Sequence, residues 1–277
     1  MIYAENMCDT IRYLSNSPQR VDILNMLTEE RMDVRDITKQ LESPRSTVQR
    51  NVSILEEKDW LRSIGSEYTA TTTGMFLCEE FVSMIRTVDT IDRIAPFLEA
   101  VDDPDEIDVE QLNDMDITTP QPGHPHLPTD KLFETLTECG QVQGLLPTVS
   151  SLSVRLFQNM EGDAPSKSEY ILSPRGVNTL YRHLATEENE NPVLEFPTNL
   201  KFWYYKSELP YGLFLTEDTV VFVAYDDLGK MQATLQSSYK QTYSWGRGIY
   251  EKYEKTSQRL EKSQVVKKVN ETTNVDE

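Results

Sequence analysis

The fold of this chain is decided by residues 33–73, DVRDITKQLESPRSTVQRNVSILEEKDWLRSIGSEYTATTT. The first part predicts a short helix that begins at Asp33, because Asp33 and Asp36 have the spacing of a capping-box variant. The apolar residues Val34, Ile37 and Leu41 then recur at helical spacing and share one face. We therefore expect an amphipathic helix on a core, followed within a few residues by a second helix.

The second helix is predicted from Ser43 to about Lys58, with Ser43 as a suitable N-cap and Pro44 at the first helical position. Its buried side is marked by apolar residues at helical spacing: Val48, Val52 and Leu55. The outward residues are polar: Arg45, Ser46, Gln49, Arg50 and Ser53. Arginine can bind guanine and glutamine can bind adenine in the major groove of DNA, although a polar face is also the default for any exposed helix.

Two short strands are predicted directly after this helix, Trp60–Ile64 and Glu67–Thr71, around a turn that contains Gly65. A hairpin at this position is a wing. The order of helix, turn, helix and wing predicts a winged helix-turn-helix, and double-stranded DNA is its expected partner.

The same segment resembles the winged-helix regulators of the MarR and ArsR type. Residues 44–52 stand in the place of the recognition helix, and residues 68–74 close the wing. We predict a DNA-binding face in which Arg62, near the wing, contacts phosphate. The other residues of this face lie on or next to the second helix: Ser43, Arg45, Ser46, Thr47, Gln49 and Arg50.

The charge of the chain is unusual for a DNA-binding protein, since its 277 residues carry a net charge of -19. Residues 1–65 have a net charge of only -2, whereas residues 66–130 have -13 and residues 131–277 have -4. Acidic surfaces of this kind suit a cytosol at molar salt, so a halophilic archaeal source is expected. At about 1 M salt the Debye length is about 3 Å, and direct base contacts must then carry more of the binding. The alternative is a winged-helix module whose partner is another protein.

Helices are also predicted on both sides of this module. Residues 2–14 and 21–27 supply two helices that complete a small core. A long helix follows from Met75, and Pro96 is expected to break or kink it near Ala95. Its apolar residues alternate in the spacing of a heptad seam and predict a homodimer that reads a palindromic operator: Leu77, Phe81, Met84, Val88 and Ile91. The seam could equally dock on the chain's own domains.

Residues 101–130 are acidic and then rich in proline, which predicts a linker without regular structure. From residue 129 onward helices and strands alternate, which predicts a mixed sheet with helices on its faces. The expected helices are Lys131–Glu138, Leu152–Gln158, Pro174–Leu184 and Tyr239–Leu260. The expected strands are Val142–Leu146, Glu169–Leu172, Leu200–Tyr205, Tyr211–Thr216, Thr219–Ala224 and Met231–Gln236.

This second half resembles the middle domain of archaeal methanogenesis-type regulators, which is distantly similar to half of a phospholipase-D-like fold. The carrying segments are Val142–Pro147, Glu169–Pro174, Leu209–Asp218 and Tyr225–Gly229. The resemblance implies a transcription factor and does not identify a ligand. The chain is therefore expected to be an α+β protein with a winged helix at residues 1–74, a connecting and dimerisation helix at 75–100, a ligand-sensing regulatory domain at 101–260 and a disordered tail at 261–277.

No enzyme is expected. The phospholipase-D-like fold hydrolyses phosphodiesters with a His-x-Lys pair, which this sequence lacks, and no cofactor-binding motif is present. A ligand pocket is predicted instead on the strand that carries Lys201, Trp203 and Tyr205, with Tyr211 opening the next strand and Arg175 as a further anion contact. The aromatic residues could equally do no more than cover the sheet.

The remaining chemistry-bearing residues point to a reduced cytoplasm and to no metal. Cys8, Cys78 and Cys139 are widely separated, and a redox role for Cys8 or Cys78 stays open. His124 and His126 have no further ligand at metal spacing, so a solvated loop is expected there. No export signal or membrane span is predicted.

Overall fold

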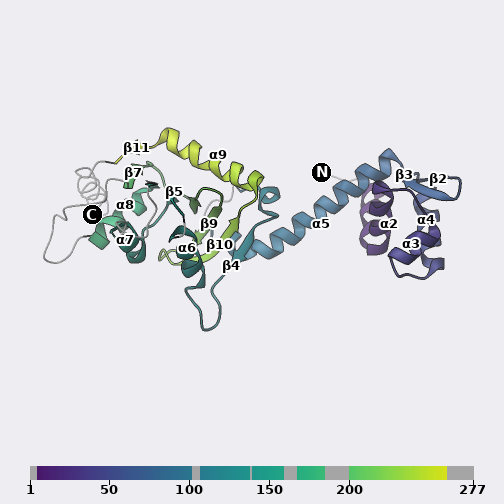
Figure 1. Ribbon diagram of the computed structural model, residues 1–277, viewed down its shortest axis with the longest axis horizontal. Coiled ribbons are helices and arrows are strands. Elements are labelled where there is room, and N and C mark those ends of the chain that lie inside the picture. Colours follow the sequence, from purple (N-terminus) through teal and green to yellow (C-terminus); the bar gives the residue numbers. More distant parts are fainter. Residues whose placement is uncertain (1–4, 102–106, 138, 159–166, 185–199, 261–277) are drawn as a thin grey trace. The chain divides into compact units, whose positions relative to one another are not determined.

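The computed structural model describes residues 5–101, 107–137, 139–158, 167–184 and 200–260 (Figure 1). The chain divides into two compact units, Met1–Asp89 and Thr90–Glu277. The division falls inside one helix, α5 (Thr72–Leu98). The tail predicted at 261–277 lies outside the described residues.

The first unit is a winged helix, as predicted. Its elements in chain order are α1 (Glu5–Ser15), α2 (Pro18–Glu29), β1 (Met32–Asp33), α3 (Val34–Gln40), α4 (Arg45–Glu57), β2 (Leu61–Ile64) and β3 (Glu67–Ala70). The strands form an antiparallel sheet in the order β1-β3-β2. Gly65 has a φ of 67° in the turn between β2 and β3, a conformation that favours glycine. Strand β1 was not predicted, because two residues are too short to produce a periodic pattern.

The helices of the first unit are positioned by a single apolar core. The apolar side of α4 is buried as predicted, through Val48, Val52 and Leu55. This apolar side of α4 packs in one cluster with Ile37 of α3 and with residues of α2. Helix α3 begins at its predicted cap, where the Asp33 carboxylate accepts hydrogen bonds from the backbone N–H groups of residues 35 and 36.

The start of α4 differs from the prediction. The helix begins at Arg45, and Pro44 rather than Ser43 occupies the N-cap. The Ser43 side chain turns inward instead. Its hydroxyl donates to the Leu41 carbonyl at 3.0 Å and accepts from Nε2 of Gln19 at 2.7 Å. Ser43 therefore ties the turn between α3 and α4 to helix α2.

Helix α5 corrects two further predictions. It continues through Pro96 to Leu98, so the predicted break near Ala95 does not occur, whereas a kink there stays a prediction. Ile94 and Phe97 are buried in the core of the second unit and stabilise the last turn of the helix. The predicted heptad seam is also divided. Phe81 is buried in the core of the first unit, and Leu77 packs against the same core. The other three seam residues are exposed, and so is a neighbouring isoleucine: Met84, Val88, Ile91 and Ile85.

The second unit contains an eight-stranded sheet in the order β11-β7-β6-β5-β8-β9-β10-β4. Its strands are β4 (Asp116–Thr118), β5 (Gln141–Leu146), β6 (Lys167–Leu172), β7 (Leu200–Tyr204), β8 (Gly212–Leu215), β9 (Val220–Tyr225), β10 (Met231–Ser237) and β11 (Gln258–Arg259). Its helices after α5 are the short 3-10 helix η2 (Val109–Leu112), α6 (Leu127–Thr137), α7 (Ser151–Gln158), α8 (Pro174–Leu184) and α9 (Lys240–Thr256). Strands β5, β6 and β7 are parallel, and the remaining pairs are antiparallel.

The mixed sheet with helices on its faces is confirmed, and it forms the middle of three layers (Figure 1). Neighbouring residues of β9 point to opposite faces. Val221 packs in a cluster with α6, α7 and α8, whereas Phe222 packs in a cluster with α9 and the end of α5. Both faces of the sheet are therefore covered by helices, and open surface is left at the strand ends.

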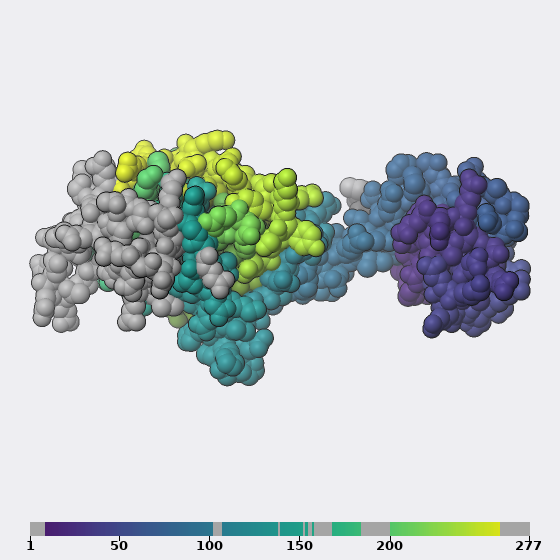
Figure 2. Space-filling view, viewed as in Figure 1, coloured from purple at the N-terminus to yellow at the C-terminus, as the bar shows by residue number. Residues whose placement is uncertain are grey.

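The segment predicted as an irregular linker contains regular structure. Strand β4 pairs with β10, and η2 precedes it. The proline-rich part forms a turn in which residues 121 and 124 are bridged. Residues 121–126 are all exposed and protrude from the second unit, in teal in Figure 2.

The described residues contain neither a membrane-spanning helix nor a metal-ligand group. Within the described ranges, no helix combines the length and apolarity that crossing a membrane needs. In the same part of the chain, His124 and His126 belong to no group of three or more metal-ligating side chains.

Candidate nucleic-acid interface

The predicted reading face of α4 is open to solvent. All five of its residues on this helix are exposed: Arg45, Ser46, Thr47, Gln49 and Arg50. Arg62 is exposed on β2, and β2 packs against α4. Ser43 does not belong to this face, because it is 9% exposed and its hydroxyl is bonded on the inner side of the turn. The geometry thus presents two arginines and one glutamine on one helix beside a hairpin.

The arginines of this face carry free positive charge. None of Arg45, Arg50 and Arg62 forms an ion pair among the described residues. The acidic excess of the chain is concentrated in residues 66–130, beyond this helix. The face can therefore offer its guanidinium groups to an anionic partner without first breaking an internal bond.

A second basic group, which no sequence pattern indicates, adjoins α4. The Arg20 guanidinium lies 4.1 Å from the ring centre of Tyr13, and Nζ of Lys58 lies 4.8 Å from the same centre. Burial raises the pKa of Tyr13, while the nearby charges of Arg20 and Arg50 act in the opposite direction. These residues come from α1, α2 and the end of α4, so no local pattern in the sequence brings them together.

In the part of the chain that the structure describes, the aromatic side chains predicted to line a pocket on β7 pack on the sheet. Trp203 and Tyr205 pack in the cluster that α9 covers, and the ring centres of Tyr205 and Tyr253 are 5.0 Å apart. Tyr211 is 1% exposed and packs edge-on against Phe222. Lys201 forms an ion pair with Glu169 at 2.8 Å, so its charge already has a partner. Among the described residues this packing agrees with the alternative interpretation, that these aromatic residues cover the sheet, and the ligand pocket on β7 stays a prediction.

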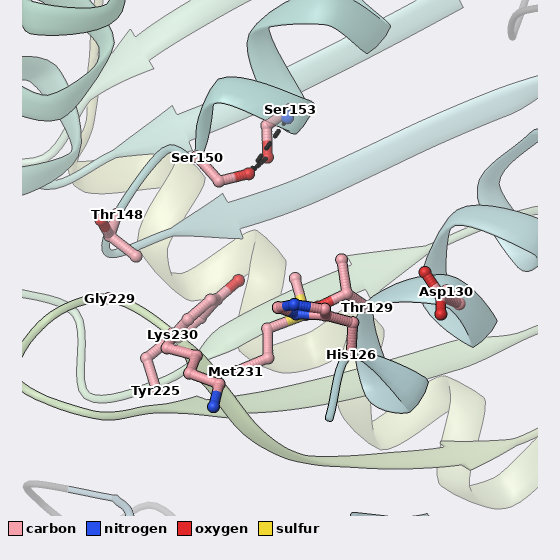
Figure 3. Close-up of a pocket in the computed structure, with 10 residues that line it drawn as sticks. All are labelled: His126, Thr129, Asp130, Thr148, Ser150, Ser153, Tyr225, Gly229, Lys230 and Met231. Atoms are coloured by element: carbon pink, nitrogen blue, oxygen red, sulfur yellow. Dashed lines mark hydrogen bonds between the residues drawn. The ribbon is translucent and has the colours of Figure 1, made fainter. Parts of the chain in front are cut away.

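A cavity of about 460 Å³ lies instead at one edge of the sheet (Figure 3). Its lining comes from the start of α6, the segment that follows β5, and the turn between β9 and β10. The lining residues are His126, Thr129, Asp130, Thr148, Ser150, Ser153, Tyr225, Gly229, Lys230 and Met231. Because β5 and β6 are parallel, their carboxyl ends meet at this edge, where ligands of α/β sheets bind.

The turn between β9 and β10 is fixed by one carboxylate. Oδ1 of Asp226 accepts hydrogen bonds from the backbone N–H groups of Leu228 and Lys230, at 3.0 and 2.9 Å, and Oδ2 accepts one from Gln232. Gly229 has a φ of 78°, and a Cβ atom there would lie 2.9 Å from Oγ1 of Thr148. The backbone that carries the Lys230 side chain into the cavity lining is therefore held in one conformation.

Arg175, the further anion contact predicted from the sequence, stands at the start of α8 and lies beside this cavity. It lines a smaller recess of about 70 Å³ that shares Thr148 and Tyr225 with the larger cavity. Its guanidinium donates to the carbonyls of Asp226 and Asp227. Arg175 therefore supports the β9–β10 turn.

The described cysteines are not activated thiols. Cys78 is buried, and burial together with the nearby Glu79 charge raises the pKa of its thiol. Burial likewise raises the pKa of Cys139 to about 11. A raised pKa lowers the thiolate fraction on which reactivity depends. The Cys8 side chain lies outside the described residues.

Both parts of the chain are similar to known domain families. Residues 8–93 match the family model of the HVO_A0261 N-terminal domain, and residues 125–256 match that of the middle domain of the methanogenesis regulatory protein FilR1. Each part of the chain is thus similar to one of these domain families, and the resemblance of its second half to methanogenesis-type regulators is confirmed. None of the curated proteins compared with the chain matches it.

Three solved structures are similar at low identity. TrmBL2, an archaeal chromatin protein whose structure is said to show a novel mode of DNA binding, is 11% identical over 93% of this chain and 100% of its own, with a TM-score of 0.35. NucT from Helicobacter pylori is 10% identical over 53% of this chain and 98% of its own, with a TM-score of 0.38. The IclR protein of Thermotoga maritima is 10% identical over 92% of this chain and 99% of its own, with a TM-score of 0.22.

Proposed function

We propose that this chain, whose two parts are similar to the HVO_A0261 N-terminal domain and to the FilR1 middle domain, is a DNA-binding transcriptional regulator. The observation that carries the proposal is the exposed face of α4, which presents Arg45, Gln49 and Arg50 while the opposite face forms the core. A helix of this kind fits the major groove, where each bidentate base contact contributes about 1–3 kcal/mol of discrimination. Arg62 on the wing then contacts the DNA backbone.

The regulator acts as a homodimer on a palindromic operator. The support is the exposed apolar surface on the middle of α5, formed by Met84, Ile85, Val88 and Ile91. A single soluble unit gains little from such a stripe, whereas a second copy of the chain would bury it. Two-fold pairing also provides the two reading helices that a palindrome needs, about one helical turn of DNA apart.

The dimer is tested by combining Val88→Glu with Ile91→Glu in the full chain. A charge on each of two buried positions should separate the protomers, because an unpaired carboxylate in an apolar interface is strongly destabilising. Light scattering should then report the monomer mass. Ile11→Glu is the matched control, because Ile11 is an exposed apolar residue on a different helix. A variant that stays dimeric would move the interface away from α5.

The second unit senses a signal and passes it to α5. The support is a set of hydrogen bonds between α5 and the segment before β4. Thr90 donates to the Asn113 side chain at 2.6 Å, and the Arg93 guanidinium donates to the carbonyls of Asn113 and Met115. Strand β4 in turn pairs with β10, so a shift of β10 would be felt by the helix that leads into the winged helix. A ligand shifts the DNA-competent population by its differential affinity for the two states, and a tenfold effect needs about 1.4 kcal/mol.

The second unit acts without catalysis in this proposal. The three histidines of the sequence are His124, His126 and His183, and none has a lysine two residues later. A phospholipase-D-like reaction would therefore lack both its nucleophile and its general acid.

The proposed function is tested by selecting DNA from a random pool with the full chain in molar KCl. A regulator should enrich a two-fold symmetric sequence. A pool that stays random in both molar and low salt would overturn the proposal and favour the alternative, a winged-helix module that binds another protein. The net charge of -19 favours this alternative, because a strongly acidic protein is repelled by the phosphates of DNA.

A further inference from the structure

The cavity at the edge of the second unit's sheet carries positive charge without a paired carboxylate. Lys230 and His126 both line it, and neither forms an ion pair among the described residues. Among the described lining residues Asp130 alone is acidic, and it lies on the opposite side of the lining from Lys230 and Tyr225 (Figure 3). Asp130 and Lys230 are both exposed. Lys230 can therefore offer its ammonium group to an anion in this cavity without first breaking an ion pair with a described residue.

The cavity also contains hydroxyl groups without partners. Thr148 is only 7% exposed, yet its hydroxyl forms no hydrogen bond with any residue that the structure describes. The Tyr225 hydroxyl likewise has no partner in the described part of the chain, and Figure 3 shows it on the cavity side of its ring. Ser150 and Ser153 bond to each other at 2.9 Å. The Thr148 and Tyr225 hydroxyls are therefore free to form hydrogen bonds with a ligand in the cavity.

We infer that this cavity binds a small organic anion, whose carboxylate or phosphate group lies between Lys230 and the Tyr225 hydroxyl. An apolar body of the ligand then contacts the Met231 side chain and the face of the Tyr225 ring. The size of the cavity, about 460 Å³, is within the range of small-molecule sites. This inference rests on the proposed sensor function and supplies it with a site and a ligand class.

The site is organised before the ligand arrives. Asp226 holds the β9–β10 turn through its backbone bonds, and Arg175 supports the same turn from the other side. A preorganised donor loses less conformational entropy on binding. Met231 is both a lining residue and the first residue of β10, the strand that pairs with β4. Occupancy of the cavity therefore acts on β10, and β10 pairs with β4, which directly follows the segment that is hydrogen-bonded to α5.

The ligand class is tested by calorimetry on the full chain with four probes. Benzoate and phenyl phosphate join an anion to an apolar ring, inorganic phosphate lacks the ring, and benzyl alcohol lacks the charge. At least one ring anion should bind, and the two incomplete probes should each bind at least about tenfold more weakly. Benzyl alcohol loses the hydrogen bonds to a charged group, and inorganic phosphate loses the apolar contact of the ring. Benzoate and phenyl phosphate together distinguish a carboxylate site from a phosphate site. Absence of binding by both at millimolar concentration, or equal binding by benzyl alcohol, would overturn the inference.

The position is tested with paired variants. Lys230→Met and Tyr225→Phe should each weaken the best ring anion about tenfold, because each removes one donor and keeps most of the side chain. The matched controls are Lys131→Met and Tyr239→Phe, which alter exposed residues outside the lining. Binding that is unchanged in both test variants would place the site elsewhere and overturn the assignment.

The readout on DNA separates this inference from the proposed function. Operator affinity is measured with and without a saturating ring anion, after the operator has been selected independently. An altered affinity supports both claims. A probe that binds in the cavity without altering operator affinity leaves the site in place and overturns its regulatory role. If no operator can be selected while the probe binds, the DNA-binding proposal fails and the anion site stands.

Discussion

The outward face of α4 and the aromatic face of β7 were predicted by the same kind of argument, and only one of them is open. The α4 residues Arg45, Gln49 and Arg50 are exposed, whereas Trp203 and Tyr205 lie under α9. The core that buries the other side of α4 comes mainly from α2, α3 and the wing, which are its close neighbours in sequence. Strand β7 is instead covered by a helix that begins 36 residues after the strand ends. Periodicity identifies a buried face reliably where the covering residues are local.

The pairing of charges also separates the exposed face of α4 from the covered face of β7. The α4 arginines form no ion pair with any residue that the structure describes, but Lys201 is bonded to Glu169, whose side chain is only 10% exposed. A buried carboxylate needs such a partner, so Lys201 serves the sheet. An exposed cation with no partner is the better sign of a binding surface.

The largest expected effect is on the covered face. Tyr211→Ala should reduce the free energy of unfolding of the second unit by about 3–5 kcal/mol, since it empties a fully buried aromatic site beside Phe222. Denaturant unfolding followed by circular dichroism measures this loss. Tyr239→Ala, at an exposed tyrosine, should change stability little. Equal and small effects of both variants would mean that the β7–β8 face is open after all.

The next largest effect is on the exposed face. Arg50→Ala and Gln49→Ala should each weaken binding to the selected operator by about 1–3 kcal/mol, because each removes one base contact, and neither should alter thermal stability. Fluorescence anisotropy with labelled operator in molar KCl gives the affinity. Arg86→Ala is the control, because Arg86 is an exposed arginine of α5 away from the reading helix. Affinities that match the parent chain would remove α4 from the interface.

Most of the first unit could be predicted because its signals are local. The Asp33 cap, the Gly65 turn and the apolar spacing of α4 each involve residues within a few positions of one another. The failures have a different cause. Pro96 lies inside α5 because Phe97 and Ile94 are buried, and Phe81 leaves the predicted seam because the first unit's core takes it. Tertiary packing determines both the position of Pro96 and the burial of Phe81. A heptad pattern does not show whether its apolar residues pack on a second copy or on the chain's own core.

The cavity could not be predicted because three separate segments line it. His126, Thr148 and Lys230 come together only when β5 and the β9–β10 turn meet at one edge of the sheet. One signal was available in the sequence. The hydroxyl residues Thr148 and Ser150 follow a predicted strand, and the carboxyl ends of parallel strands are where ligands bind. The aromatic cluster on β7 was the more conspicuous pattern, and it belongs to the core.

The smallest expected effect concerns Ser43, the one predicted DNA contact that the structure buries. Its hydroxyl joins Gln19 of α2 to the Leu41 carbonyl, so Ser43→Ala should lower the free energy of unfolding of the first unit by about 1 kcal/mol. Operator preference should stay the same, because no base contact is lost. Gln19→Ala removes the other half of the same bond and should produce a similar loss of stability. Selecting operators with both variants decides the role of Ser43: a changed preference at one base pair in Ser43→Ala alone would return Ser43 to the reading face, whereas equal stability losses with unchanged preference assign its hydroxyl to the turn between α3 and α4.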